Sequence, residues 1–182
     1  MNWADFDAHF DRFTSSVFRL ETLQDYTAPG EAYRIEAFLR GQPRPERSVR
    51  TSPWLARIAV STATQGKRWG RVRVVEEPLT DYTRYEFAGY VESQAAGEEI
   101  RIVRRAASRA LSVLRQDFWL FDAETVDACA LLMDYAADGT WLGGELVTDL
   151  ARLQRFRAER DLALAYSVPL NEYLAREARK AA

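Results

Sequence analysis

The chain has 182 residues, 47% of them hydrophobic, and a formal net charge of −2, as expected of one globular domain over residues 1–182. One cysteine and one histidine exclude an internal disulfide, a cysteine-built zinc site and a two-histidine metal site. No stretch approaches the ~20 apolar residues that span a bilayer, and the first residues lack the apolar run of a signal peptide, so we expect a cytoplasmic protein.

Charge is unevenly distributed along the chain. Residues 1–39 carry a net −4, residues 40–115 a net +7 and residues 116–182 a net −5. Such asymmetry predicts either a basic surface in the middle third or ion pairing between the thirds within one fold. We favour pairing.

The first forty residues predict a helix, a break and a short second element. Apolar residues recur every three or four positions, the period of an amphipathic helix, at Phe6, Phe10, Phe13, Val17 and Leu20. We therefore predict one helix over residues 6–20. Pro29 and Gly30 mark a break, residues 31–40 fit either a helix or a strand, and the proline- and arginine-rich residues 42–52 are predicted to be a loop.

The middle of the chain predicts a helix followed by a β-α-β unit. Ser52 is a suitable N-cap for a helix with Pro53 in its first turn, and Gly66 is a suitable stop. Two segments of β-branched residues alternating with arginine, Trp69–Glu76 and Glu99–Arg104, flank a helical stretch from Thr80 to Ala96. This order implies a parallel pair of strands with a right-handed crossover.

The last third predicts three strands and two helices. Residues 118–121 are a short apolar strand, and residues 125–135 are apolar on both alternating faces, which is typical of a central strand. Asp138 and Gly139 predict a hairpin to a returning strand over residues 140–147. One helix is expected after Asp149, and a last helix is expected to open at Ser167, Val168 and Pro169. The predicted fold is therefore α/β or α+β, with a mixed sheet of about five strands flanked by N- and C-terminal helices.

Catalytic motifs are absent from the sequence. It has no phosphate-binding GxxxxGK[ST] or GxGxxG, no HExxH, no GxSxG and no CxxC. We therefore predict no catalytic residue, no metal site and no cofactor.

Carboxylates at the predicted strand ends offer the enzymatic alternative. Ligands bind beyond the carboxyl ends of strands in open parallel sheets, where Glu76 is expected. Glu76, Glu86 and Asp122 could together form an acid pair or hold magnesium. Acids are also common at strand ends simply because turns are solvated.

Arginines and aromatic residues near the β-α-β unit suggest a ligand or interaction site. Its candidate residues are Arg71, Arg73, Glu76, Tyr82, Tyr85, Glu86, Asp117, Trp119 and Asp122. Nucleic acid is one ligand that arginine with aromatic residues favours. The opposing prediction is that the arginines pair with neighbouring acids, namely Glu76, Glu77, Glu98 and Glu99. We expect pairing, and hence no strong direct binding of nucleic acid.

Three blocks carry a family resemblance: residues 70–86, residues 97–101 and residues 117–122. With these blocks the chain resembles a family of uncharacterised actinobacterial proteins known only as a domain of unknown function. Members of that family tend to be encoded beside small helix-turn-helix regulators. The resemblance implies a bacterial protein in a regulatory neighbourhood and brings no activity with it.

A second resemblance concerns the order of elements, which is similar to half of a phospholipase-D-like domain. The signature of that family is HxKxxxxD. With its aspartate placed on Asp122, Asp117 occupies the lysine position and Arg115 the histidine position. Both reactive residue types are missing, so this half-domain would be degenerate and without phosphodiester chemistry.

The sequence therefore favours a non-catalytic interaction or regulatory partner in transcriptional or signalling control, with a helix-turn-helix regulator as the expected partner. The alternative is a small-molecule-binding protein, or an enzyme that uses carboxylates near Glu76, Glu86 and Asp122. The two classes differ in what they require: a deep pocket with converging groups of perturbed pKa, or an exposed apolar or basic patch.

Overall fold

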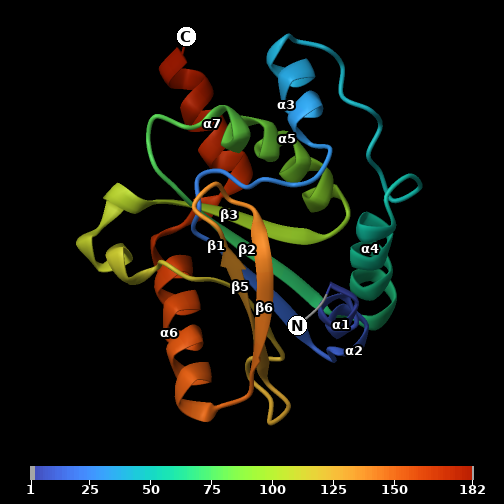
Figure 1. Ribbon diagram of the computed structural model, residues 1–182, viewed down its shortest axis with the longest axis vertical. Helices are drawn as coiled ribbons and strands as arrows, with labels where there is room; N and C mark the ends of the chain where they lie inside the picture. Colours follow the sequence, from blue (N-terminus) through green and yellow to red (C-terminus); the bar gives the residue numbers. More distant parts are fainter. Residues whose placement is uncertain (1–2, 182) are drawn as a thin grey trace.

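One mixed sheet runs through the molecule, and the computed structural model describes it and its covering helices over residues 3–181. Its strands lie in the order β6-β5-β4-β1-β2-β3-β7, with β1, β2 and β3 parallel and every other neighbouring pair antiparallel (Figure 1). The strands are β1 (Ser16–Glu21), β2 (Arg68–Val75), β3 (Glu98–Arg104), β4 (Asp117–Phe121), β5 (Cys129–Tyr135), β6 (Trp141–Val147) and β7 (Val168–Pro169). The fold is α+β, as predicted.

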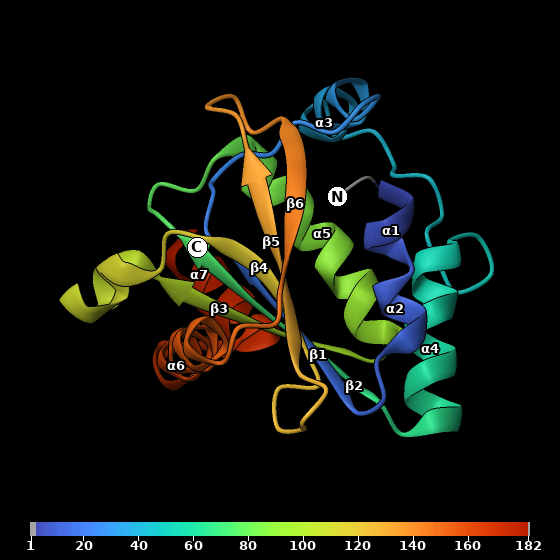
Figure 2. The ribbon, with the colours of Figure 1, turned by 60° about the horizontal axis from the view of Figure 1, so that its bottom comes forward.

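Helices cover both faces of this sheet. They are α1 (Trp3–Asp7), α2 (His9–Arg12), α3 (Ala32–Leu39), α4 (Pro53–Gln65), α5 (Asp81–Ala95), α6 (Leu150–Tyr166) and α7 (Leu170–Ala181), with the 3-10 turns η1 (Arg105–Ala107) and η2 (Arg109–Val113). Helix α6 covers one face, whereas α1, α2, α4 and α5 lie over the other (Figure 2). Within residues 3–181, the structure contains no helix with the length and hydrophobicity needed to span a bilayer.

Two separate apolar layers result from the alternation of side chains along the strands. Phe18, Leu20, Val72 and Val74 face α6, where Phe156 is fully buried among them. On the opposite face, aromatic rings of α2 and the strands meet around Phe10, whose ring centroid lies 4.8 Å from that of Trp119 and 5.8 Å from that of Trp69. α7 packs beside α5 at the β3 edge, where Tyr173 contacts Phe87 at 5.6 Å between ring centroids.

The predicted β-α-β unit is present: α5 connects the parallel strands β2 and β3. The Thr80 hydroxyl caps α5 by accepting a hydrogen bond from the backbone N–H of Thr83 at 3.1 Å. The capping expected for α4 is present as well, with Ser52 as N-cap and Gly66 in the left-handed region at φ +65°. The predicted Asp138–Gly139 turn joins β5 to β6.

The single helix predicted over residues 6–20 is wrong beyond Arg12. After the short helices α1 and α2, the chain turns and enters β1, the middle strand of the sheet. The turn is held by Asp122, whose carboxylate accepts hydrogen bonds from the backbone N–H groups of Thr14, Ser15 and Ser16. Phe13, Val17 and Leu20 had the spacing of a helix, but pairing with β2 and β4 satisfies the backbone of β1 instead.

Three further features of the fold differ from the prediction. The sheet has seven strands rather than five, because β1 and the two-residue β7 were not predicted. The strand predicted to begin at residue 125 begins at Cys129. The N–H and the hydroxyl of Thr125 donate hydrogen bonds to the Asp122 carbonyl instead, which forms a turn. The last helix begins at Leu170, because Val168 and Pro169 first pair with β3. Residues 31–40, which fitted helix or strand, contain the helix α3.

Candidate functional site

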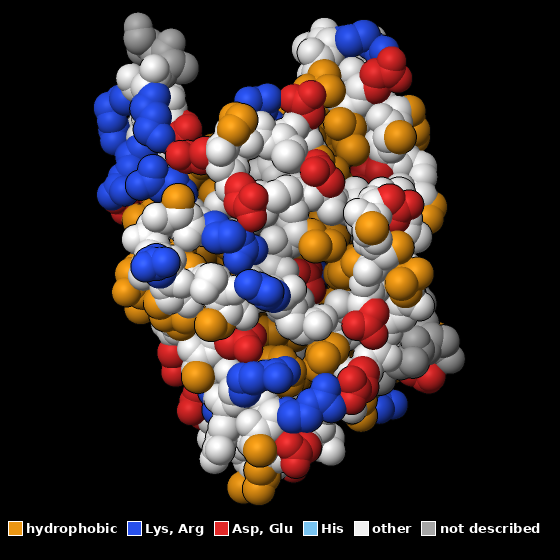
Figure 3. Space-filling model, turned by 60° about the vertical axis from the view of Figure 1, so that its left-hand side comes forward, with side chains coloured by type: hydrophobic (Ala, Val, Ile, Leu, Met, Phe, Trp, Pro, Cys, Tyr) orange, Lys and Arg blue, Asp and Glu red, His pale blue; other side chains and the backbone are white. Residues whose placement is uncertain are grey.

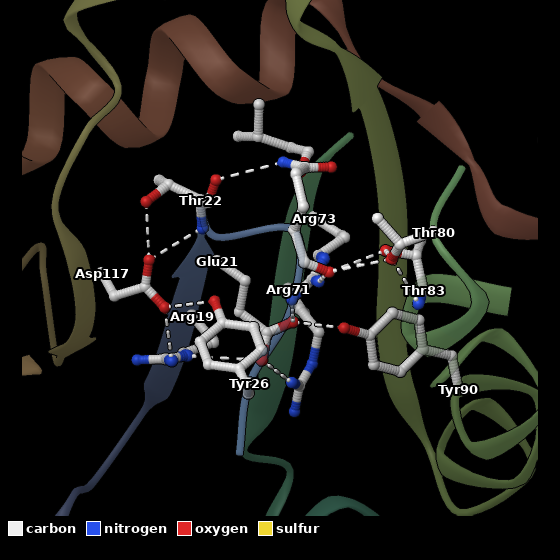
Figure 4. Close-up of polar contacts among 12 residues, drawn as sticks. Arg19, Glu21, Thr22, Tyr26, Arg71, Arg73, Thr80, Thr83, Tyr90 and Asp117 are labelled. Carbon is white, nitrogen blue, oxygen red and sulfur yellow. Dashed lines mark hydrogen bonds and ion pairs between the residues drawn. The ribbon is translucent and has the colours of Figure 1, made fainter. Parts of the chain in front are cut away.

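Charged side chains of β1 and β2 lie side by side on the sheet face that Tyr90 of α5 approaches (Figure 4). Arg19 of β1 lies opposite Arg71 of β2 in the strand register, and Glu21 lies opposite Arg73. Since successive residues of a strand point to opposite faces, these four side chains share one face. Arg19, Glu21 and Arg73 are at most 7% exposed. A group of ions is therefore buried in the middle of the fold, which is costly unless the charges are paired.

Asp117 of β4 organises one side of this group. Its Oδ2 accepts hydrogen bonds from Arg19 Nη2 at 2.8 Å and from Tyr26 Oη at 2.5 Å. Its Oδ1 accepts hydrogen bonds from the backbone N–H of Thr22 at 2.8 Å and from the hydroxyl of Thr22 at 2.7 Å. Arg19 Nη2 also donates to Tyr135 Oη at 3.2 Å. Asp117 thereby connects β1 to the loop that follows β1, and Arg19 extends this network to β5 through Tyr135.

Glu21 organises the other side. Its Oε1 accepts a hydrogen bond from Arg71 Nη1 at 2.6 Å, and its Oε2 accepts one from the Tyr90 hydroxyl. Arg73 Nη1 lies 3.8 Å from the same Oε2. Arg71 Nε donates in turn to Oε1 of Glu98 at 2.8 Å. Two carboxylates from β1 and β3 therefore hold Arg71 on both sides.

The environment moves the pKa values of two neighbouring glutamates in opposite directions. Burial alone would raise the pKa of Glu21, but Arg71, Arg19 and Arg73 outweigh it and lower that pKa to about 2. Burial and then the charge of Glu21 raise the pKa of Glu86, on α5, to about 7. Glu21 is therefore ionised at neutral pH, whereas Glu86 exchanges its proton near neutrality. Pairs of carboxyl groups with diverging pKa values are typical of functional sites.

Some nitrogens of this group have no hydrogen-bond partner within the described residues. They are Arg19 Nη1, and Arg73 Nε and Nη1, all of them buried. Arg73 uses only Nη2, which donates to the carbonyl of Gln24 at 3.0 Å, and its guanidinium lies 4.8 Å from the centroid of the Tyr26 ring. A buried donor without an acceptor costs about 1–3 kcal/mol, more for a charged group. The arginines therefore retain unused capacity to bind an acceptor.

A cavity of about 570 Å³ adjoins Arg19 and Glu21. Beyond these two residues, its walls come from the loop after β1, the first turn of α5 and the β5–β6 hairpin, and consist of Tyr26, Thr27, Ala28, Pro29, Tyr82, Met133, Tyr135, Gly139 and Trp141. Its size is that of small-molecule sites, which typically measure about 300–1,000 Å³. The cavity thus combines aromatic walls with a charged floor.

Six of the nine candidate residues predicted from the sequence converge on this region. Arg71, Arg73, Asp117 and Trp119 lie on the sheet face, where the guanidiniums of Arg19 and Arg71 lie 5.3 and 5.6 Å from the centroid of the Trp119 ring. Tyr82 and Glu86 approach from α5: Tyr82 lines the cavity, and the charge of Glu86 acts on Arg73.

The other three candidates lie elsewhere. Tyr85 is buried on the side of α5 that faces α3, with its ring centroid 5.7 Å from that of Phe38 and 5.1 Å from the guanidinium of Arg44. Glu76 is exposed after the carboxyl end of β2, and Asp122 lies beside the amino end of β1, which runs parallel to β2. Strands rise about 3.3 Å per residue, so the length of β2 separates these two carboxylates. The structure does not bring Glu76, Glu86 and Asp122 together as the acid site that the sequence suggested.

No group of three or more histidine, cysteine, aspartate or glutamate residues with the geometry of a metal site occurs in the described part of the chain. The expected pairing of arginines is visible in four ion pairs. They join Arg71 to Glu98, Arg101 to Glu99, Arg104 to Glu77 and Arg105 to Glu76, with nitrogen–oxygen distances of 2.8, 3.6, 3.6 and 2.9 Å.

Sequence reasoning missed half of the site. The residues that it overlooked are Arg19, Glu21, Tyr26, Tyr90, Tyr135 and Trp141. A signal for the first two exists, because Phe18, Arg19, Leu20 and Glu21 alternate between apolar and charged as residues 71–74 do. The prediction of a helix over residues 6–20 concealed it.

Comparison with known proteins gives one family. A family model described as a domain of unknown function (DUF6879) matches residues 4–175, which is nearly the whole chain. No curated protein matches the chain.

Proposed function

Because the chain belongs to the DUF6879 family, whose description assigns no activity, we propose from the site itself that it is a non-catalytic small-molecule-binding protein. The observation that carries this proposal is Arg19: it lines the cavity, is 3% exposed and has a terminal nitrogen to which no described residue offers a hydrogen-bond acceptor. A buried, unused donor beside an aromatic-walled cavity of this volume is the arrangement of a ligand site.

Filling the cavity tests this proposal. Ala28 lines the cavity and is exposed, so Ala28→Trp places a large ring there without touching the charged network. Ala137→Trp is the matched control, since Ala137 is exposed near the hairpin turn but does not line the cavity. The measurement is the shift in melting temperature on adding each member of a small-metabolite library. A ligand at 100 times its Kd stabilises the folded state by about 2.7 kcal/mol.

We expect at least one compound to raise the melting temperature of the wild type and of Ala137→Trp but not of Ala28→Trp. If no compound of any charge does so, or if Ala28→Trp responds like the wild type, binding in this cavity is refuted.

A regulatory interaction, with a helix-turn-helix partner as the family resemblance implies, is a second candidate. What supports it is an apolar groove of about 640 Å³ between α5 and α7, lined by Leu79, Phe87, Ala88, Val91 and Leu174 and rimmed by charges. The surface in Figure 3 is hollowed at the top, beside the projecting end of α7. Val91 is 50% exposed although it is apolar.

Co-expression with the neighbouring gene product tests this second candidate. We expect Val91→Glu to abolish copurification, whereas Val113→Glu, which replaces a valine of similar exposure outside the groove, should retain it. Copurification that persists in Val91→Glu would argue against this groove, and its absence from the wild type would argue against the partner.

A further inference from the structure

We propose that the cavity takes a planar aromatic acid, whose anionic group binds Arg19 and whose ring lies among the aromatic walls. This inference rests on the proposed function and names the class of its ligand.

The first property is the hydrogen-bonding state of Arg19. Its Nη2 is occupied by Asp117 and Tyr135, and its Nε lies 3.6 Å from Glu21 Oε1. Its Nη1 has no partner among the described residues and is buried. A guanidinium nitrogen can only donate, so the group that completes it must accept hydrogen bonds. A carboxylate is the strongest common acceptor for arginine.

The second property is the charge of the floor. The buried Arg19 and Arg73 and the partly buried Arg71 are matched by three carboxylates, Glu21, Glu98 and Asp117. The ligand therefore meets a network that is already balanced, with arginine nitrogens in excess of their partners. A cationic ligand would leave those nitrogens without an acceptor and would repel Arg19, although aromatic walls by themselves also suit cations.

The third property is the orientation of the aromatic walls. The hydroxyls of Tyr26 and Tyr135 are held at Asp117 and Arg19, which leaves their rings as wall surface. Their ring centroids lie 5.0 Å apart at an interplanar angle of 66°. The centroid of Tyr82 is 5.9 Å from that of Tyr26. Flat faces in these directions favour a planar, apolar body on the ligand.

Binding of an anionic ligand should be coupled to protonation of Glu86. The charged and titratable groups that face Glu86 come from β1, β2, the residue before α3, and α5 itself: Glu21, Arg71, Arg73, Glu31, Tyr82 and Tyr90. An additional anion nearby raises the pKa of Glu86 further, so the ligand binds best when Glu86 is protonated. Affinity for an anion should therefore fall as the pH rises through 7, whereas affinity for a cation should rise.

The test uses three probes of one shape and different charge: 2-naphthoate, 2-naphthamide and 2-naphthamidinium, titrated calorimetrically at about pH 6 and about pH 8. We expect naphthoate to bind at least about tenfold more tightly than the other two at the lower pH. Its affinity should fall about threefold at the higher pH, and Glu86→Gln should remove that fall while retaining binding.

Arg19→Lys keeps a cation beside Asp117 but removes the second terminal nitrogen. We therefore expect this variant to bind 2-naphthoate at least about tenfold more weakly than the wild type does. The unfolding curve of Arg19→Lys checks that this variant folds. The comparison of the three probes uses the wild type alone and so does not depend on the variant. Stronger binding of the amide or the amidinium, an affinity for naphthoate that rises with pH, or no binding of any probe would each overturn the aromatic-acid class. The metabolite library and the Ala28→Trp variant test ligand binding in the cavity independently of these probes. A failure of the aromatic-acid class can therefore be distinguished from a failure of the proposed function.

Discussion

Tyr26 donates a hydrogen bond of 2.5 Å from its Oη to Oδ2 of Asp117, across 91 positions of sequence. This contact fixes the loop after β1 over the charged floor. Burial and the adjacent Asp117 charge raise the pKa of Tyr26 well above its ordinary value, so Tyr26 remains a phenol and a donor at physiological pH. The wall of the cavity and its floor are thereby one hydrogen-bonded unit.

Removal of Asp117 should destabilise the fold strongly. Asp117→Ala leaves Arg19 buried without its carboxylate, and breaking a buried pair costs about 3–5 kcal/mol. Asp134→Ala, at an exposed position on the neighbouring strand β5, should change the free energy of unfolding by less than about 0.5 kcal/mol. Urea unfolding monitored by circular dichroism compares the two. A loss below about 1 kcal/mol for Asp117→Ala would show that the network contributes little.

The stability of the protein should depend on Glu86 between mildly acidic and mildly basic pH. Burial and Glu21 raise its folded pKa to about 7, above the ordinary value of 4.5. The folded state therefore holds this proton more tightly, and the stability that it contributes is present below about pH 4.5 and lost as the pH rises through 7. We expect Glu86 to account for a fall of about 1–3 kcal/mol in unfolding free energy between about pH 5 and about pH 8.

Urea titrations of the wild type and Glu86→Gln at both pH values isolate this contribution. Glu86→Gln should flatten the profile, whereas Glu76→Gln, at an exposed position, should follow the wild type. Parallel profiles of the wild type and Glu86→Gln would contradict the assignment.

The elements with local signals were predictable. Ser52 and Gly66 mark the ends of α4 by capping chemistry that needs no distant partner. Arg71 and Arg73 were recognised because charged and β-branched residues alternate in β2, which predicts a strand with two different faces. Their convergence with Asp117 follows from the adjacency of β1 to both β2 and β4, which no local pattern contains.

The rest of the site depends on long-range pairing. Arg19 and Glu21 lie in a six-residue strand whose apolar residues also fit a helical period, and only pairing with β2 and β4 selects the strand. The cavity itself forms where the hairpin turn meets the loop after β1, as Thr27 N–H donates to the Gly139 carbonyl at 3.0 Å. Such an approach is set by the tertiary fold and not by the composition of either loop.

Ion pairing of the basic middle third predicts weak binding of nucleic acid. Arg71 is held by Glu21 and Glu98, so its charge is not free to replace counterions on a phosphate backbone. We expect labelled duplex and single strands to bind more weakly than about 1 μM at physiological salt. Fluorescence anisotropy measures this. Tighter binding that is lost in Arg68→Ala, at an exposed arginine on the same strand, would contradict the prediction.

Substitution of Gly139 by alanine should both destabilise the fold and disturb the cavity. Its φ is +82°, and a Cβ added there would lie 2.7 Å from the Asp25 carbonyl oxygen and 2.9 Å from Cα of Tyr26. Both neighbours are backbone atoms, so Gly139→Ala must displace the loop that carries Tyr26. Gly30 is the matched control, because its φ is +74° but a Cβ there meets nothing within 4 Å.

Conformational strain alone should cost Gly30→Ala about 1–2 kcal/mol in unfolding free energy. Gly139→Ala adds the clash, and we expect it to lose at least about 2 kcal/mol more, within the range of strong single mutations. Because Gly139 and Tyr26 both line the cavity, Gly139→Ala should also lower the affinity for 2-naphthoate, whereas Gly30→Ala should leave that affinity unchanged. Urea unfolding and calorimetry measure the two effects. Equal losses for both variants, with unchanged probe affinity, would mean that the loop yields without disturbing the site.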